Sequence, residues 1–328
     1  MITAVADASQ VAEARRLAAG FALRQGVPEQ RVAQLSLVVT ELATNLLKHG
    51  SGGSILVDTF DDQDGVGVEV LALDSGPGMA DVERCIADGY STAGSPGNGL
   101  GAIFRQSDRV HIYSRPGRGT AVTARFVMAA TKPPRSVQLG AAVAPYPGEL
   151  VCGDTWVMAE AQDGGTMLVA DGSGHGIEAA RAAETAARLF RNQVNDPCER
   201  LAERLHRGLM PTRGAAIAIA RVDPAARVIR YVGIGNITGA LVVDGRVQHM
   251  ISYNGTAGHV APRIREMTYP FSGDPTLILH SDGLTPRWDL AAYPGLTRQH
   301  PSLIAGVLLR DFRRGRDDAS VVVMRTLL

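Results

Sequence analysis

Residues 41–49 of the chain read Glu41-Leu42-Ala43-Thr44-Asn45-Leu46-Leu47-Lys48-His49. Glu41, Asn45 and His49 are four residues apart, so on a helix they share one face, and Leu42 and Leu46 share the neighbouring face. An amide oxygen is a hard ligand that suits Mg²⁺, and a carboxylate one turn away can accept the proton of an attacking hydroxyl. The pattern predicts a helix that carries such groups, although a solvated helix face has the same pattern.

The sequence on both sides of this stretch predicts an α+β unit. Helices are expected over residues 5–19, 29–49, 82–88 and 100–107, and strands over 54–60, 66–73, 109–114 and 120–126. The long helix should end at His49, because Gly50, Gly52 and Gly53 follow it. Helices and antiparallel strands in this order predict a two-layer sandwich.

A second polar segment follows the strand expected at 66–73, and it reads Asp74-Ser75-Gly76-Pro77-Gly78-Met79. A carboxylate at a strand end, beside glycines that let a ligand approach the backbone, suits the amino group of adenine. A simple turn uses the same residue types, because Asp, Gly and Pro are the commonest turn residues.

A glycine-rich segment leads directly into the helix expected at 100–107, and it reads Gly97-Asn98-Gly99-Leu100-Gly101. Free backbone N–H groups at a helix N-terminus after such a loop can bind phosphate. The segment is not a Walker A loop, because no Lys-Ser/Thr follows it. Gly117-Arg118-Gly119-Thr120 precedes the last strand, and the four segments in this order are far more specific than any one alone.

These four segments resemble the N, G1, G2 and final Gly-Thr boxes of the GHKL ATPase/kinase superfamily. They are most similar to the RsbT-type serine kinases of bacterial stress-signalling partner switches, as is the lid sequence at residues 88–94. The resemblance covers nearly all of residues 1–128 and implies a GHKL (Bergerat) α/β sandwich over residues 1–130.

The resemblance also implies roles for individual residues. Glu41 would be the general base and Asn45 the Mg²⁺ ligand, while His49 would only cap or pack. ATP would be bound by Asn45, Asp74, Gly76, Gly78, Asn98, Gly99, Leu100, Gly101 and Thr120. Among these, Asp74 and Gly78 would recognise adenine.

A linker is expected at 131–136, because Pro133-Pro134 with the polar flank Thr131-Lys132 cannot continue a helix or a strand. Strands are expected over residues 166–170, 215–222, 228–233, 239–243, 276–280 and 320–325, and helices over 177–194 and 197–209. This order predicts a second α+β domain over 137–328, with two packed sheets and flanking helices.

Acidic residues recur in four turn-like settings of this second part, at Asp154, Asp171, Asp282 and Asp317-Asp318. Each is expected at the mouth of a strand, where several strands bring the carboxylates together. Clustered carboxylates repel one another unless cations neutralise them, and all-oxygen ligands suit Mg²⁺ or Mn²⁺. Two such ions can activate water and hold a phosphoryl group. Surface turns also contain Asp-Gly, but four such settings in this order favour a metal site.

The second part resembles the metal-dependent (PPM-type) phosphatases in their SpoIIE-like bacterial branch. Segments 148–154, 171–176 and 233–237 are especially similar to RsbX, so an α/β/β/α phosphatase sandwich is implied. Cys152 and Thr155-Trp156 depart from the commoner Gly-Gly-Asp-Phe/Tyr motif of this branch. Because the Asp is kept, the departure puts substrate contacts at this segment in doubt and not metal binding.

By this resemblance, two Mn²⁺ or Mg²⁺ ions would be held by Asp154, Asp171, the Gly172 carbonyl, Asp282 and Asp317. Asp171 would bridge both ions and be the catalytic carboxylate, and Asp318 would orient its neighbour. His175 could protonate a leaving alkoxide or simply hold its loop, and Asn236 could hold a turn.

The composition limits the class of partner. Lys plus Arg and Asp plus Glu both number 33, so no net charge attracts nucleic acid or a membrane. Three widely spaced cysteines and the lack of an 18-residue apolar run predict a cytoplasmic protein.

The two resemblances together predict a bifunctional regulator that phosphorylates and dephosphorylates Ser or Thr of a STAS-domain protein in trans. The first alternative makes the N-terminal domain a nucleotide- or partner-binding module that regulates the phosphatase. A second alternative is a phosphatase in a sigma-factor regulatory complex.

Overall fold

The structure is a computed structural model that describes residues 1–86, 99–130, 137–161 and 164–326. The chain divides into two compact units: the first unit is Met1–Arg135 with Arg298–Arg310, and the second unit is Ser136–Thr297 with Asp311–Leu328. The α+β architecture predicted for the chain is confirmed. The linker expected at 131–136, the lid sequence at 88–94 and Asn98 lie outside the described residues.

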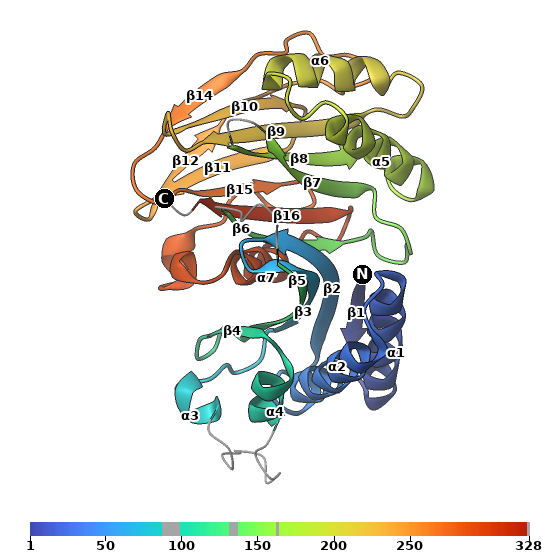
Figure 1. Ribbon diagram of the computed structural model, residues 1–328, viewed down its shortest axis with the longest axis vertical. Coiled ribbons are helices and arrows are strands. Elements are labelled where there is room, and N and C mark those ends of the chain that lie inside the picture. The colour runs from blue at the N-terminus through green and yellow to red at the C-terminus, as the bar shows by residue number, and fades with distance from the viewer. Residues whose placement is uncertain (87–98, 131–136, 162–163, 327–328) are drawn as a thin grey trace. The chain divides into compact units, whose positions relative to one another are not determined.

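The first unit contains an antiparallel five-stranded sheet in the order β1-β2-β3-β5-β4 (Figure 1). Its strands are β1 (Ile2–Val5), β2 (Gly53–Asp62), β3 (Gly65–Asp74), β4 (Arg109–Ser114) and β5 (Thr120–Ala129). Its helices from this part of the chain are α1 (Ala8–Arg24), α2 (Glu29–His49), α3 (Val82–Ile86) and α4 (Gly99–Gln106).

The start of the first helix was predicted wrongly. Val5 is the last residue of β1, and α1 begins at Ala8. The reason is the N-cap: the Asp7 carboxylate accepts hydrogen bonds from the backbone N–H groups of Ser9 and Gln10, which fixes the helix start. The helix therefore starts after the capping residue Asp7, although the apolar spacing predicted an earlier start.

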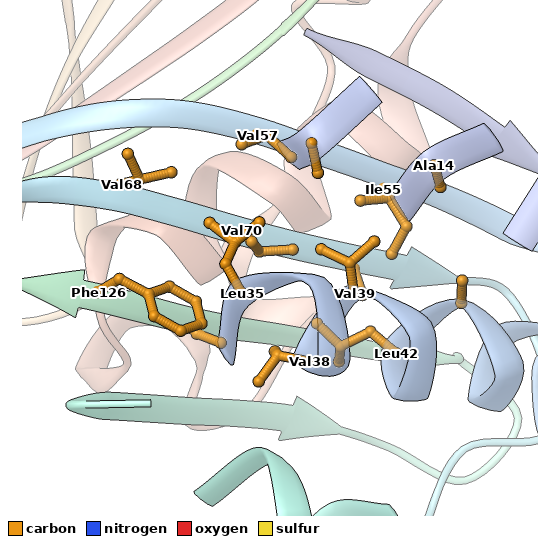
Figure 2. Close-up of a cluster of buried hydrophobic side chains, with 14 of the residues drawn as sticks. Ala14, Leu35, Val38, Val39, Leu42, Ile55, Val57, Val68, Val70 and Phe126 are labelled. Carbon is orange, nitrogen blue, oxygen red and sulfur yellow. The ribbon is translucent and has the colours of Figure 1, made fainter. Parts of the chain in front are cut away.

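The core of the first unit lies between α2 and one face of the sheet, as Figure 2 shows. The buried residues of α2 include Leu35, Val38, Val39 and Leu42, and they pack against Ile55, Val57, Val68, Val70 and Phe126 of the strands. Side chains alternate along a strand, so the residues of β3 between these core positions point to the opposite face of the sheet.

That opposite face of β3 is also buried, since Glu69 is 7% exposed, Leu71 2% and Leu73 4%. Residues Arg298–Arg310 belong to the first unit and include most of α7 (Pro301–Phe312). Helix α7 was not predicted from the sequence. Its residues 303–309 are apolar on every side and so lack the 3.6-residue alternation that identifies a surface helix.

The second unit contains two sheets (Figure 1). One has the order β13-β10-β9-β8-β7, with β14 paired to β10, and the other has the order β12-β11-β15-β16-β6. The strands are β6 (Val137–Ala144), β7 (Asp154–Ala161), β8 (Gly164–Gly172), β9 (Ala215–Asp223), β10 (Val228–Ile234), β11 (Thr238–Val243), β12 (Arg246–Met250), β13 (Ser252–Tyr253), β14 (Met267–Pro270), β15 (Thr276–His280) and β16 (Ala319–Thr326). Helices α5 (Ile177–Arg191) and α6 (Cys198–Gly208) come between β8 and β9 in the chain, and the short η1 (Leu290–Ala292) and η2 (Leu296–Arg298) follow β15.

Two cores explain the layers of the second unit. Met167 and Val169 of β8 join Leu277 of β15 and Val322 of β16 in one buried cluster, so the two sheets pack face to face. The alternate residue Leu168 belongs to another cluster, which contains residues of α5 and α6. The described helices include none that is long and apolar enough to cross a membrane.

Candidate functional site

The polar face of α2 meets the start of α4 in the first unit. A Cβ atom placed on Gly99 would lie 3.1 Å from Glu41 Oε2 and 3.6 Å from Asn45 Oδ1. Glu41 and Asn45 are half-buried, whereas His49 is exposed at the end of the helix. The structure thus brings the carboxylate and the amide to the helix terminus that was predicted to bind phosphate, and Leu100 and Gly101 form the next part of that helix.

Asp74 is the last residue of β3, and hydrogen bonds hold its carboxylate. Oδ1 accepts from the backbone N–H groups of Gly76 at 2.8 Å and Thr120 at 3.2 Å. Burial raises the pKa of Asp74, and these two hydrogen bonds and the nearby charges of Arg310 and His49 oppose that rise. The predicted residues Asp74, Gly76 and Thr120 therefore form one local arrangement.

Two glycines of this region are required by the space around them. Gly78 has a φ of 70°, and a Cβ there would lie 2.0 Å from the carbonyl oxygen of Arg115. Gly119 has a φ of 75°, and its Cβ would lie 2.0 Å from the carbonyl oxygen of Asp74. A side chain at Gly119 would push away the backbone of Asp74, and a side chain at Gly78 would push away the backbone of Arg115.

In the second unit, strand register brings two of the predicted carboxylates together. Asp154 and Asp171 are opposite one another in the pair formed by β7 and β8. The next backbone N–H, of Gly172, donates to the carbonyl oxygen of Gly153 at 3.0 Å. Asp282 follows β15 and Asp317 precedes β16, and these two strands are also paired.

Asp154 is the first residue of β7, so it lies at the mouth of a strand, as predicted. The apolar stretch before it is on the surface, since Leu150 is 100% exposed and Val151 is 39% exposed.

The carboxylates of this cluster destabilise one another's charged forms. Burial and the neighbouring Asp154, Asp282, Asp317 and Asp318 raise the pKa of Asp171 to about 9. Burial also raises the pKa of Asp154 to about 7, against the hydrogen bond that Ser281 donates to it. Groups that resist ionisation in this way are stabilised by a bound cation.

Hydrogen bonds orient most of these carboxylates. Ser281 Oγ donates to Asp154 Oδ2 at 2.6 Å, and Asn236 Nδ2 donates to Asp282 Oδ2 at 2.7 Å. The backbone N–H of Asp318 donates to Asp317 Oδ1 at 2.9 Å. Ser281 was not predicted from the sequence, and Asn236 was predicted only to hold a turn, although Asn236 lies in a segment already identified by resemblance.

The donor set fits divalent cations. Asp154 Oδ1 and Asp318 Oδ2 are buried and have no hydrogen-bond partner among the described residues. Burying a carboxylate oxygen without a hydrogen bond costs free energy of folding unless a bound cation interacts with it. Mg²⁺ and Mn²⁺ prefer ligand sets made of oxygen atoms, as this one is. Asp318 was predicted only to orient Asp317, so its free Oδ2 adds a second candidate role for that residue.

His175 is held at the edge of this cluster. Its ring stacks on Tyr146, with centroids 4.3 Å apart, and its Nδ1 lies 3.1 Å from Glu149 Oε1. Of the two roles expected for His175, these contacts support holding its loop rather than protonating a leaving alkoxide.

A different set of side chains in the first unit comes close to metal-site geometry. In the part of the chain that the structure describes, one atom each of Asp64, His111 and His300 lie within 4.8 Å of one another. Nδ1 of His300 accepts from the Ser302 backbone N–H at 3.2 Å, so a neutral ring carries its proton on Nε2. Asp64 Oδ2 also accepts from Arg125 at 3.0 Å. Asp64 therefore belongs to the ion network around Arg125, and His300 Nε2 lies 3.8 Å from its carboxylate.

Comparisons with known proteins identify a family for each of the two parts of the chain. The family model for the histidine kinase-like ATPase domain matches residues 4–126, and the model for stage II sporulation protein E (SpoIIE) matches residues 162–327. The serine/threonine-protein kinase RsbT of Bacillus subtilis (strain 168) is 31% identical over 114 residues, which are 35% of this chain and 86% of RsbT. An anti-sigma F factor of Thermoanaerobacter sp. (strain X514) is 29% identical over 115 residues, 33% of this chain and 79% of that protein.

Two solved structures are similar to 58% of the chain. One comes from work on the bacterial stressosome as a modular system that controls secondary messenger signalling, with 26% identity, a TM-score of 0.54 and 99% of that chain covered. The other is RsbX in complex with magnesium, with 22% identity, a TM-score of 0.52 and 95% coverage. The two predicted resemblances are confirmed: the chain belongs to the SpoIIE family of PPM-type phosphatases through its C-terminal part, and its N-terminal part is an RsbT-like histidine kinase-like ATPase domain.

Proposed function

We propose that the chain is a bifunctional partner-switching regulator. Its first unit would transfer phosphate from ATP to Ser or Thr of a STAS-domain protein supplied in trans, and its second unit would remove that phosphate. The observation that carries the proposal is that Glu41 and Asn45 meet the start of α4 at Gly99, so the kinase-like domain keeps its chemical groups and not only its fold. The similarity to RsbT and to a stressosome structure supports the choice of pathway.

In the kinase site, each residue would have a distinct task. Glu41 would accept the hydroxyl proton of the substrate, and Asn45 would bind the Mg²⁺ that accompanies ATP. The backbone at Gly99, Leu100 and Gly101 would bind the phosphates. Gly76 and Thr120 hold Oδ1 of Asp74, and Oδ2 would accept a hydrogen bond from the adenine amino group.

In the phosphatase site, Asp154, Asp171, the Gly172 carbonyl, Asp282 and Asp317 would hold two Mn²⁺ or Mg²⁺ ions. Such ions supply an activated water and a clamp for the phosphoryl group. Ser281 and Asn236 orient the carboxylates of Asp154 and Asp282 through the hydrogen bonds described above. These bonds keep one oxygen of each carboxylate occupied and leave the other for a metal.

The test follows phosphorylation of a STAS-domain protein by intact mass with three versions of the full-length chain. Wild type should consume ATP with little net phosphorylation, Asp171→Ala should accumulate phosphorylated substrate, and Glu41→Ala should only remove phosphate. If Asp171→Ala phosphorylates none of the STAS-domain proteins offered, the bifunctional proposal is wrong.

A second candidate function is a phosphatase whose nucleotide-binding unit only regulates it. It is favoured by one observation: residues 298–310 belong to the first unit, and Asp317 follows seven residues later in the same chain. ATP that changes the phosphatase rate of the Glu41→Ala protein, without any phosphoryl transfer by Asp171→Ala, would support this function. The similarity to an anti-sigma F factor makes a sigma-factor complex a further candidate partner.

A further inference from the structure

Helix α7 contacts strand β3 through residues that are four positions apart in the helix. Ser302 Oγ donates to Glu69 Oε2 at 2.8 Å. One turn later, a Cβ on Gly306 would lie 2.9 Å from a methyl carbon of Leu71 and 2.8 Å from one of Leu73. Residues four apart share one face of a helix, so this face follows β3 towards its C-terminal end.

The third residue of this face reaches the nucleotide site. Arg310 is one further turn along α7, and its NH1 donates to the backbone carbonyl oxygen of Asp74 at 2.8 Å. Gly119 closely approaches the same carbonyl, so the end of β3 is confined from two directions. The Asp74 carboxylate is bonded in turn by Thr120, the residue that follows Gly119.

The charge of Arg310 acts on Asp74 as well. Burial raises the pKa of the Asp74 carboxyl, whereas Arg310 on α7 and His49 at the end of α2 favour its ionised form. An ionised carboxylate is the better acceptor for the adenine amino group, because a protonated one can lose an acceptor oxygen to its own proton.

We propose that Arg310 is a positioning residue of the ATP site, so that residues 298–310 of the first unit, far from the nucleotide motifs in sequence, complete adenine recognition. The inference rests on the proposed ATP site. Arg310 would not touch the nucleotide; it would fix the backbone at Asp74 and thereby direct the carboxylate. The first unit would then need residues 298–310 to bind ATP with full affinity and selectivity.

The test measures binding of ADP and GDP with Mg²⁺ to the full-length protein by calorimetry between pH 5 and pH 8. Arg310→Gln should weaken ADP binding about tenfold, the scale of a hydrogen bond from a charged donor, and should reduce the preference for ADP over GDP. It should also move the acidic loss of ADP binding to higher pH, because the charge that favours ionised Asp74 is gone. Arg310→Lys, which keeps the charge, should restore the pH profile more than the affinity.

Arg298→Gln is the matched control, because Arg298 is an exposed arginine of the same segment. If wild type binds no adenine nucleotide, the proposed ATP site itself is wrong. If wild type binds but Arg310→Gln keeps its affinity, selectivity and pH profile, the role of Arg310 is overturned. Equal weakening of ADP and GDP with an unchanged pH profile would show a purely structural role and overturn it too. If Arg310→Gln does not unfold cooperatively on heating, it is not properly folded, and the same binding measurements on Arg310→Lys then test the proposal.

Discussion

The two candidate sites achieve ligand affinity by opposite means. In the second unit, burial and the surrounding carboxylates raise the pKa of Asp171 to about 9, so the ionised form of this site is unfavourable until cations neutralise it. In the first unit, one carboxylate, Asp74, is already held by backbone N–H groups and by the approach of glycine backbone. The phosphatase site should therefore depend on its ions for both activity and stability, whereas the nucleotide site should be largely formed without its ligand.

The strongest test of this comparison removes one carboxylate from the crowded site. Asp171→Asn keeps the shape of the side chain but removes a charge that both metals would share. Hydrolysis of a generic phosphoester with Mn²⁺ should fall about 10³-fold, since a bound metal supplies several kcal/mol of transition-state stabilisation. The exposed Asp244→Asn is the matched control. Undiminished hydrolysis by Asp171→Asn would show that the metal site lies elsewhere.

A smaller effect is expected from the residue that orients Asp282. Asn236→Ala removes the 2.7 Å hydrogen bond to Asp282 Oδ2. The Mn²⁺ concentration for half-maximal activity should rise about 10- to 100-fold, as for other partners of metal ligands. The exposed Asn254→Ala should leave the Mn²⁺ requirement unchanged. A normal Mn²⁺ requirement in Asn236→Ala would mean that this bond holds only a turn.

The corresponding change in the nucleotide site should be selective rather than drastic. Asp74→Asn replaces the charged acceptor for adenine, so ADP affinity should fall about tenfold while GDP affinity changes little. The phosphatase activity towards a generic phosphoester should stay the same in that variant. Calorimetry on the full-length protein measures the first effect, and equal losses for ADP and GDP would argue against adenine recognition by Asp74.

The smallest expected effect is on thermal stability as a function of pH. The folded-state pKa of Asp171 is raised to about 9, above its usual value of about 3.9, so the folded metal-free site binds the proton more tightly than the unfolded chain. The stability from this group is therefore complete below about pH 4 and is lost as the pH rises towards about 9. Mn²⁺ should raise the Tm by more at pH 8.5 than at pH 6, by a few degrees in a scan against chelator. Asp171→Asn should show a smaller difference between the two pH values.

The parts of the fold that the sequence predicted are those with local signals. Helix α2 runs from Glu29 to His49 as predicted, because its apolar positions repeat with the helical period and glycines follow it. Helix α7 was missed because it is apolar on every side. Strand β6 was missed as well, since Gln138, Gly140 and several alanines interrupt its apolar pattern.

The same distinction holds for the sites. Asp74, Gly99 and Asp171 lie in short motifs, so residue type and order were enough to propose them as site residues. Ser281 and Arg310 could not be proposed from the sequence, because their contacts depend on which strand or helix lies beside them after folding. Ser281 and Asp154 are 127 residues apart in sequence, and no local pattern connects them.

The contact between Arg310 and Asp74 also has a consequence for synthesis of the chain on the ribosome. The two residues are 236 positions apart, which at elongation rates of about 5–20 residues per second separates their synthesis by roughly 10–50 s. During that time Leu71 and Leu73 have been made but α7, which contacts them through Gly306, has not. The sheet of the first unit must therefore wait for its second covering layer until almost the whole protein has been translated. A nascent chain of this protein should accordingly need protection from chaperones for longer than a chain whose N-terminal domain folds from its own residues alone.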